Sequence, residues 1–173
     1  IHQKKYIIVA CHSAWKAALN GIIENTLSTM NLLGANINNI NCSIGPCIGQ
    51  SSYDVKSDFF KIFVDKSTRN RKFFIEINKD KYKFSLKKFI TFKLGEQGVG
   101  NIDTVNIDTY NDEHLCFSYR RSLHKKEDDY GRMISTITIK GDHSWELLRE
   151  IVIYLFLNCL LYTSDAADDG YRV

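Results

Sequence analysis

The hydrophobic positions of this chain change from short continuous runs to stripes at helical spacing. The run over residues 6–11 follows two lysines and is rich in β-branched residues, which is typical of a buried strand. The stripe after it predicts a helix with Ser13 as its N-cap and Gly34 as its end. The apolar residues of this stripe are Trp15, Ala18, Leu19, Ile22, Ile23, Leu27 and Met30.

Strand and helix patterns continue to alternate along the chain. Further strands are predicted over residues 37–43, 73–77, 102–107 and 133–139. Two more helices are predicted between them, and this order favours an α/β fold, a mixed sheet with helices packed on it. The earlier of these two helices is capped by Ser51 or Ser52 and buries Val55, Phe59, Ile62 and Phe63. The later one buries Leu86, Phe89, Ile90 and Leu94.

Length and composition narrow this picture. With 173 residues, of which 44% are hydrophobic, the chain can bury one core, and a single domain is expected. The net charge of +3 is mild and the lysines are spread along the chain, so nucleic acid is not expected as a partner. Residues 147–162 are apolar but interrupted, and too short for a membrane span, so no membrane partner is expected either.

The cysteines and the first residues bear on location and completeness. The five cysteines are an odd number without CxxC spacing, which suits reduced thiols and a cytoplasmic protein. The first five residues resemble neither a signal peptide nor a transit peptide, and residue 1 is not Met. We therefore expect the chain to begin inside a longer protein, with its domain truncated on the N-terminal side.

His12 stands where the first strand meets the first helix. Such a junction projects its side chain into the crevice beyond the carboxyl end of the strand, where open α/β sheets bind ligands. The positive end of the helix disfavours imidazolium, so a neutral His12 has a lone pair to offer a metal. The alternative is a histidine hydrogen-bonded in a core. The spacing of the residues around it does not decide between these two interpretations.

Two further stretches are candidates for ligand binding. Gly45 and Gly49 flank the only proline of the chain in a rigid turn whose amides can approach a ligand closely. Cys47 is either an exposed thiol of lowered pKa at the apex of this turn or a side chain packed beneath it. Arg120 and Arg121 either present paired guanidiniums to an anion or lie on a solvated face.

Three blocks of sequence resemble one known family. His12–Ala17 is similar to its His-Ala-Gly-Trp-Arg-Gly block, and Ile44–Gly49 with Ser52–Val55 to its Ile-Gly-Pro-Cys-Ile-Gly and Ser-Tyr-Glu-Val signature. Phe117–Arg121 and Tyr130–Met133 are similar to its Phe-Ser-Tyr-Arg-Arg and Thr-Gly-Arg-Met ending. This is the laccase-domain family, also called multicopper polyphenol oxidoreductases and regarded as zinc-dependent purine nucleoside phosphorylases. The resemblance covers residues 4–140.

The resemblance implies an activity and a metal. The activity is phosphorolysis of adenosine, inosine and methylthioadenosine, with adenosine deamination beside it, and the metal is zinc. His12 corresponds to a family zinc ligand that acts together with a His and a Cys upstream. His2 is a poor substitute because it lies about 30 Å away along a strand that rises about 3.3 Å per residue. Cys11 points to the opposite face of the strand and is expected to be a core thiol.

The resemblance also implies a substrate site. In it Arg120 or Arg121 holds phosphate, and the turn that contains Gly45 and Cys47 shapes the nucleoside pocket. Lys16 stands on the phosphate side where the family has Arg, which leaves that contact open because lysine lacks the bidentate fork of arginine.

Departures from the family keep two other functions open. Ala14 replaces a family Gly, and Asp108-Thr109 replaces a family Cys-Thr, so the role of that cysteine is not carried over. One alternative is a copper-dependent polyphenol oxidase, although the sequence has no cluster of histidines suited to several coppers. The other is a non-catalytic binding module derived from the family.

The end of the chain has a different character. We expect residues 1–140 to be a partial domain of this family and residues 141–173 to be a non-family tail. Residues 159–173 resemble translated sequencing-adapter read-through and are not expected to belong to the fold. Residues beyond 140 are therefore expected to pack poorly on the rest.

Overall fold

The structure, a computed structural model, describes residues 7–137 and the backbone of residues 151–156. Within these residues the chain forms two compact units. Unit 1 comprises residues 7–45, 90–105, 134–137 and 151–156, and unit 2 comprises residues 46–89 and 106–133. Unit 1 has a parallel sheet and unit 2 an antiparallel one, each with helices, so the predicted mixed α/β fold is confirmed.

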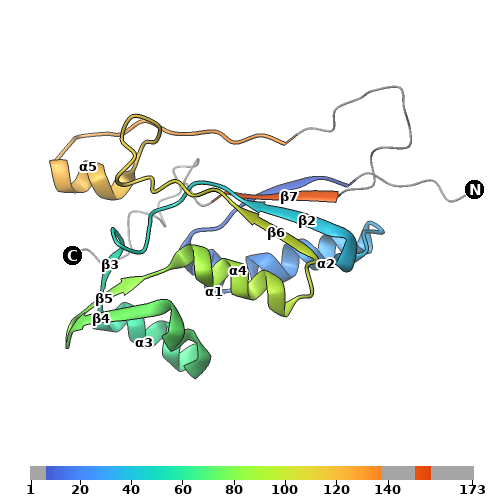
Figure 1. Ribbon diagram of the computed structural model, residues 1–173, viewed down its shortest axis with the longest axis horizontal. Helices are drawn as coiled ribbons and strands as arrows, with labels where there is room; N and C mark the ends of the chain where they lie inside the picture. The colour runs from blue at the N-terminus through green and yellow to red at the C-terminus, as the bar shows by residue number, and fades with distance from the viewer. Residues whose placement is uncertain (1–6, 138–150, 157–173) are drawn as a thin grey trace, which may run out of the picture. The chain divides into compact units, whose positions relative to one another are not determined.

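The sheet of unit 1 has four parallel strands in the order β1-β7-β2-β6 (Figure 1). They are β1 (Val9–His12), β7 (Ile151–Phe156), β2 (Ile40–Ile44) and β6 (Asn101–Thr104). Because all four strands run the same way, their carboxyl ends lie at one edge of the sheet. The register pairs His12 with Phe156, and Ile44 with Leu155 and Thr104, at that edge.

The first predicted helix is divided in two. Helix α1 (Trp15–Leu19) and helix α2 (Ile22–Leu32) are separated at Gly21, whose φ of 96° is a left-handed conformation that favours glycine. The chain leaves α2 through Gly34, as predicted, also at positive φ. Ser13 was predicted as the N-cap, but Ala14 occupies that position and no side chain caps the helix.

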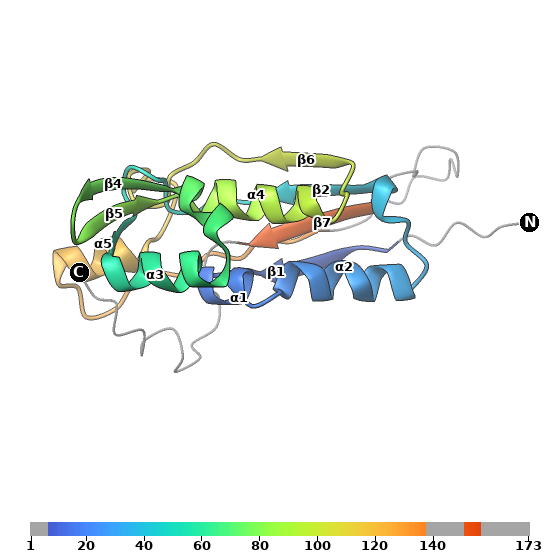
Figure 2. The same ribbon diagram turned by 90° about the horizontal axis from the view of Figure 1, so that it is seen from below.

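Helix α2 and the part of helix α4 (Leu86–Glu96) that begins at Ile90 belong to unit 1. They lie on the same side of its sheet (Figure 2). Lys93 of α4 donates to Glu24 of α2 at 2.5 Å. Most of the stripe predicted for α2 and the stripe predicted for α4 are buried, as are the inward residues of β2, whereas Ile22 is half-buried. The buried set in this unit includes Ile23, Leu27, Met30, Ile40, Cys42, Ile44, Ile90 and Leu94.

The sheet of unit 2 has three antiparallel strands in the order β3-β5-β4, and helix α3 packs against it. The elements are β3 (Asp54–Lys56), α3 (Ser57–Lys66), a 3₁₀ helix over Thr68–Phe73, β4 (Phe74–Asn78) and β5 (Lys81–Phe84). The helix predicted from Ser51 or Ser52 is therefore wrong over its first turn. Val55 lies in a strand because it pairs with Tyr82 across the sheet.

A cluster of phenylalanine rings forms the core of unit 2. Phe63 stacks on Phe59 at 5.0 Å between ring centroids, and it meets the edges of Phe74 at 5.5 Å and Phe89 at 5.1 Å. Phe84 lies 4.7 Å from Phe63. Offset and edge-on pairs of this kind are the favoured aromatic geometries, so the cluster fixes α3 and the start of α4 on the sheet.

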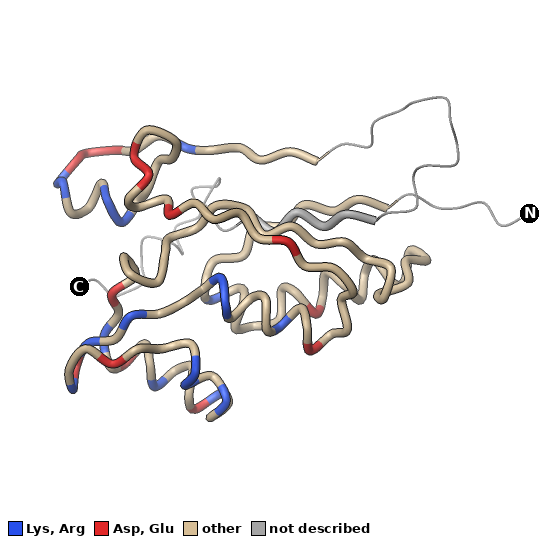
Figure 3. The backbone as a smooth tube through the Cα atoms, in the orientation of Figure 1, with Lys and Arg blue, Asp and Glu red and all other residues tan. Residues whose placement is uncertain are grey.

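Charged residues are distributed unevenly along the fold (Figure 3). Strands β1 and β2 carry no lysine, arginine, aspartate or glutamate, whereas β5 and α5 (Tyr119–Lys125) each carry two or more cations. Helix α5 belongs to unit 2, and Ser118 caps it by accepting a hydrogen bond from the backbone of Arg121. The helix ends at Lys125, and Lys126 follows it as the C-cap.

The last strand differs from the prediction. Residues 133–137 were expected to be a strand and have no regular structure; 138–139 lie outside the described residues. Residues 151–156 instead form β7 between β1 and β2, so poor packing was the wrong expectation for them. The read-through prediction for 159–173 concerns residues outside the described ones.

Within the described residues, no helix has the length and apolar character that a membrane crossing requires.

Candidate functional site

His12 and Lys16 are the candidate residues of unit 1. His12 ends strand β1, two residues before the N-cap region of α1, and both side chains are exposed. The junction therefore has the geometry that the sequence predicts, with an imidazole at the carboxyl edge of a parallel sheet. Zinc binding by His12 and phosphate binding by Lys16 stay predictions.

The donor set around His12 fits one corner of a metal site. An exposed, strand-anchored imidazole is a suitable zinc ligand. Among the described residues there is no group of three His, Cys, Asp or Glu side chains that would complete such a site. Cys11 is half-buried, and this burial raises the pKa of its thiol. It therefore remains the core thiol that the sequence predicts. His2 lies outside the described residues.

Cys47 is buried, which decides between the two interpretations of this residue. Its side chain has 0% exposure, and burial raises the pKa of the thiol to about 11, although Lys87 acts in the opposite direction. The interpretation of Cys47 as an exposed thiol of lowered pKa is therefore wrong, because a buried thiolate would lose its hydration. Cys47 packs beneath the turn. Its backbone forms a parallel bridge with Asp108 of the neighbouring loop.

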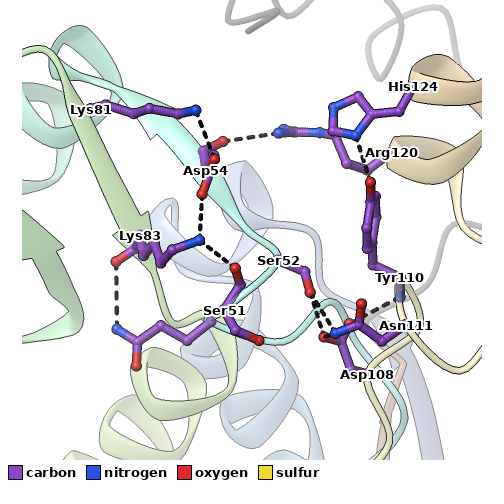
Figure 4. A network of polar contacts seen from close by, with 11 residues as sticks. Ser51, Ser52, Asp54, Lys81, Lys83, Asp108, Tyr110, Asn111, Arg120 and His124 are labelled. Carbon is purple, nitrogen blue, oxygen red and sulfur yellow. Dashed lines mark hydrogen bonds and ion pairs between the residues drawn. The ribbon is translucent and has the colours of Figure 1, made fainter. Parts of the chain in front are cut away.

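Asp108 is the residue that connects this turn with the loop after β6. One carboxylate oxygen accepts the amides of Gly49 and Tyr110, both at 2.9 Å. The other accepts the Ser52 hydroxyl at 2.6 Å and the Asn111 amide at 2.9 Å (Figure 4). Burial by itself would raise the pKa of Asp108, but these hydrogen bonds outweigh it, so its pKa lies below the usual value.

Arg121 holds the same loop from the other side. Its guanidinium donates to the carbonyls of Thr109 at 2.7 Å, Tyr110 at 2.9 Å and Cys116. These three guanidinium donors of Arg121 are used within the protein, which indicates a structural role and not ligand binding. The Arg121 side chain therefore serves the loop over residues 109–116.

Arg120 has a different environment. It donates from Nη1 to the backbone carbonyl of Asp54 at 2.9 Å, and its guanidinium lies 5.4 Å from the centre of the Tyr53 ring. The Asp54 carboxylate accepts Lys81 at 2.9 Å and Lys83 at 2.8 Å (Figure 4). Burial would raise the pKa of Asp54, but the two lysines outweigh it and lower the pKa. Two lysines thus contact the Asp54 carboxylate and Arg120 contacts its backbone carbonyl, so the net charge of these four residues is positive.

Two further contacts lie in and beside the C-terminal blocks. The Phe117 ring lies against Gly131, where an added Cβ would come within 2.4 Å of the ring and would require the half-exposed Phe117 side chain to move. Tyr110 meets His124 through a 2.7 Å hydrogen bond. Sequence reasoning did not single out Tyr53, Asp54 or the lysines of β5. The signal for the first two was their place in the Ser52–Val55 block, whereas nothing in the sequence marks the lysines.

Comparison with known proteins gives this arrangement a family. Residues 1–140 match the family described as multi-copper polyphenol oxidoreductase laccase. The chain belongs to this family. The match includes the junction at His12, the turn after β2, and the arginine pair of α5, which are the three blocks in which the resemblance was found.

Relatives in this laccase family carry another name. A purine nucleoside phosphorylase of Rickettsia conorii is 38% identical over 135 residues, which are 78% of this chain and 55% of the relative. The purine nucleoside phosphorylase YfiH of Escherichia coli is 28% identical over 130 residues, 75% of this chain and 50% of the relative. The chain thus spans about half the length of the curated relatives it matches.

Solved structures of similar proteins agree with the fold. The crystal structure of a Bacillus licheniformis hypothetical protein YfiH has a TM-score of 0.57 at 26% identity, over 64% of this chain and 43% of that one. A Neisseria meningitidis protein has a TM-score of 0.55 at 24% identity, over 62% of this chain and 43% of that one. At that identity the second likeness concerns the fold alone.

Proposed function

We propose that this chain is part of a purine nucleoside phosphorylase, which splits adenosine, inosine or methylthioadenosine with phosphate. The observation that carries the proposal is the 38% identity over 135 residues to a relative of that name. We further propose adenosine deamination as a side activity and a cytoplasmic location. The odd number of cysteines without CxxC spacing supports that location.

His12 is our proposed zinc ligand in this chain, and the remaining ligands are proposed to precede residue 1. Its exposure at the carboxyl edge of the unit 1 sheet supports this role, since a ligand must reach the metal without a core in between. Zinc, when bound, would supply a Lewis acid or an activated water. The proposed role of His12 is to hold the metal through a neutral imidazole nitrogen.

Arg120 is our proposed phosphate ligand. Its single hydrogen bond to the Asp54 carbonyl leaves most of its fork uncommitted among the described residues, while Arg121 spends its donors on three carbonyls. The net positive charge of Lys81, Lys83 and Arg120 around Asp54 adds attraction for an anion. For Lys16 the proposed phosphate contact rests on the resemblance alone.

The turn that includes Gly45 and Cys47 is proposed to border the nucleoside. Its support is the place of the turn directly after β2, at the carboxyl end of that strand, with the buried Cys47 side chain packed beneath it. Cys47 thus contributes through packing and backbone, in agreement with the raised pKa of its thiol.

The test uses the protein extended at its N-terminus by the upstream His and Cys of the relatives. Zinc content by elemental analysis and phosphate-dependent release of hypoxanthine from inosine are measured together. We expect stoichiometric zinc and turnover, and we expect His12→Ala to lose both, because removing one of three ligands removes affinity and geometry at once. His114→Ala, which removes an exposed histidine of the loop before α5, is the matched control and should keep both.

Three outcomes would count against the proposal. Full zinc and turnover in His12→Ala would make His12 a core or surface histidine. Copper in place of zinc, together with oxidation of phenols, would favour a polyphenol oxidase. Absence of both activities in a folded, metal-loaded protein would favour a non-catalytic module.

A further inference from the structure

We infer that Asp108 is a positioning residue, which fixes the Pro46–Gly49 turn and thereby decides which part of the substrate this turn can accept. The second half of this statement rests on the proposed function, and the first half does not. Asp108 stands where the resembled family usually has a cysteine. All the groups involved belong to unit 2.

The Asp108 carboxylate has no acceptor left for a ligand. A carboxylate offers about four lone-pair sites. Here four donors occupy them: the amides of Gly49 and Tyr110, the Ser52 hydroxyl and the side-chain amide of Asn111. Asp108 therefore acts through the turn and not on the substrate.

These hydrogen bonds join segments that are distant in sequence. Gly49 and Ser52 lie 59 and 56 residues before Asp108, so the carboxylate ties the turn to the loop after β6. Next to it, the amide of Thr109 donates to the Cys47 carbonyl at 3.1 Å. The turn is thus held at Cys47, Gly49 and Ser52, and Asp108 itself supplies two of these three attachments.

Gly49 and Asp108 are matched in size. A Cβ added at Gly49 would lie 2.5 Å from one carboxylate oxygen of Asp108 and 2.8 Å from its Cγ. The carboxylate cannot turn away without breaking its other hydrogen bonds. A glycine is therefore needed at residue 49 because the aspartate occupies the space beside it.

The charge of Asp108 limits what the turn can bind. Its lowered pKa keeps the carboxylate ionised at neutral pH, and the Gly49 amide, which would otherwise be an anion donor, is already occupied. A negative charge fixed against the turn disfavours phosphate there. The neutral base or ribose of a nucleoside is the part of the substrate that this turn can accept, which leaves phosphate to the cations elsewhere.

The first experiment measures the alkylation of Cys47 by N-ethylmaleimide in the folded 173-residue chain, with peptide mass spectrometry. Cys47 is fully buried under the turn, so its reaction reports release of the turn. We expect Asp108→Ala to speed its alkylation about tenfold or more, because several hydrogen bonds to a charged group are lost. Asp108→Asn, which keeps one acceptor oxygen, should fall in between, and Asp103→Ala, an exposed carboxylate of β6, should change nothing.

Cys42 separates local release from general unfolding. It is buried in β2 of unit 1, so its alkylation should stay at the wild-type rate in every variant. An unchanged Cys47 rate in Asp108→Ala would overturn the inference, and so would a parallel rise at Cys42 and Cys47. Gly49→Ala should match Asp108→Ala at Cys47. Neither measurement depends on zinc or on a nucleoside.

The second experiment tests the selectivity in the N-terminally extended protein. Asp108→Asn should raise the KM for inosine several-fold and leave the KM for phosphate unchanged. An equal rise in both KM values would show that the turn does not discriminate and would remove that half of the inference. If the extended protein has no turnover at all, the proposed function fails while the result from the thiols still stands.

Discussion

The arginine pair of α5 gives the sharpest test of how this site is built. Arg120 and Arg121 are neighbours in sequence, yet one donates to a single carbonyl and the other to three. Replacing each in turn by lysine keeps the charge and removes the planar fork. We expect Arg121→Lys to destabilise unit 2 and Arg120→Lys to leave its stability nearly unchanged.

The expected magnitude follows from the hydrogen bonds. A hydrogen bond to a charged group contributes about 1.5–3 kcal/mol, and bonds made by one half-buried side chain do not add fully. A lysine ammonium keeps at most part of the three contacts of Arg121, which gives a loss of about 2 kcal/mol. Such a loss lowers Tm by roughly 4–8 °C in a chain of this size. For Arg120→Lys, whose single carbonyl contact an ammonium can retain, the loss is below about 1 kcal/mol.

The assay is urea unfolding followed by circular dichroism, together with hydrogen exchange of peptides that cover residues 106–118. Arg121→Lys should lower the urea midpoint and speed exchange at the amides of Asp112 and Cys116, which are bonded within this loop. A free energy of unfolding within about 0.5 kcal/mol of wild type for Arg121→Lys would refute the structural role. So would a larger loss for Arg120→Lys, because it would assign the two arginines the other way round.

Four further predictions concern stability. In thermal melts, Ser13→Ala should stabilise the chain by about 1–2 kcal/mol, since the buried Ser13 hydroxyl has no hydrogen-bond partner among the described residues. Ser118→Ala, which removes the cap of α5, should destabilise it by about 1 kcal/mol in the same measurement. The lowered pKa values of Asp54 and Asp108 contribute stability above a pH of about 4, and this stability is lost as the pH falls through the folded-state pKa values. A urea midpoint that stays constant from pH 6 to pH 2.5 would contradict this prediction. Phe63→Ala should cost about 3–5 kcal/mol in urea unfolding, because the ring has 0% exposure and four aromatic neighbours rely on it.

The sequence determined those elements whose pattern is local. Leu86, Phe89, Ile90 and Leu94 recur at helical spacing and are all buried in α4, because residues three and four apart on a helix share one face. Strand β2 and the exit from α2 at Gly34 were predictable for the same reason. Each of these features depends only on neighbours within about one turn or one strand.

Other elements were decided by partners far along the chain. Val55 has the apolar spacing of the helix that follows it, but it pairs with Tyr82, and the hydrogen bonds of that ladder place it in β3. The strand over residues 151–156 was not predicted, and its place between β1 and β2 depends on pairing with residues more than 100 positions away. Pairing of this kind leaves no period in the sequence.

The candidate site divides in the same way. The positions of His12 at the end of β1 and of Gly49 in its turn follow from local sequence, since a strand end and a glycine turn are both local signals. The burial of Cys47, the choice between Arg120 and Arg121, and the four donors around Asp108 do not. Asp108 appeared in the sequence only as a departure from the family, because hydrogen bonds that span 56 and 59 residues exist only once tertiary structure has brought a loop and a turn together.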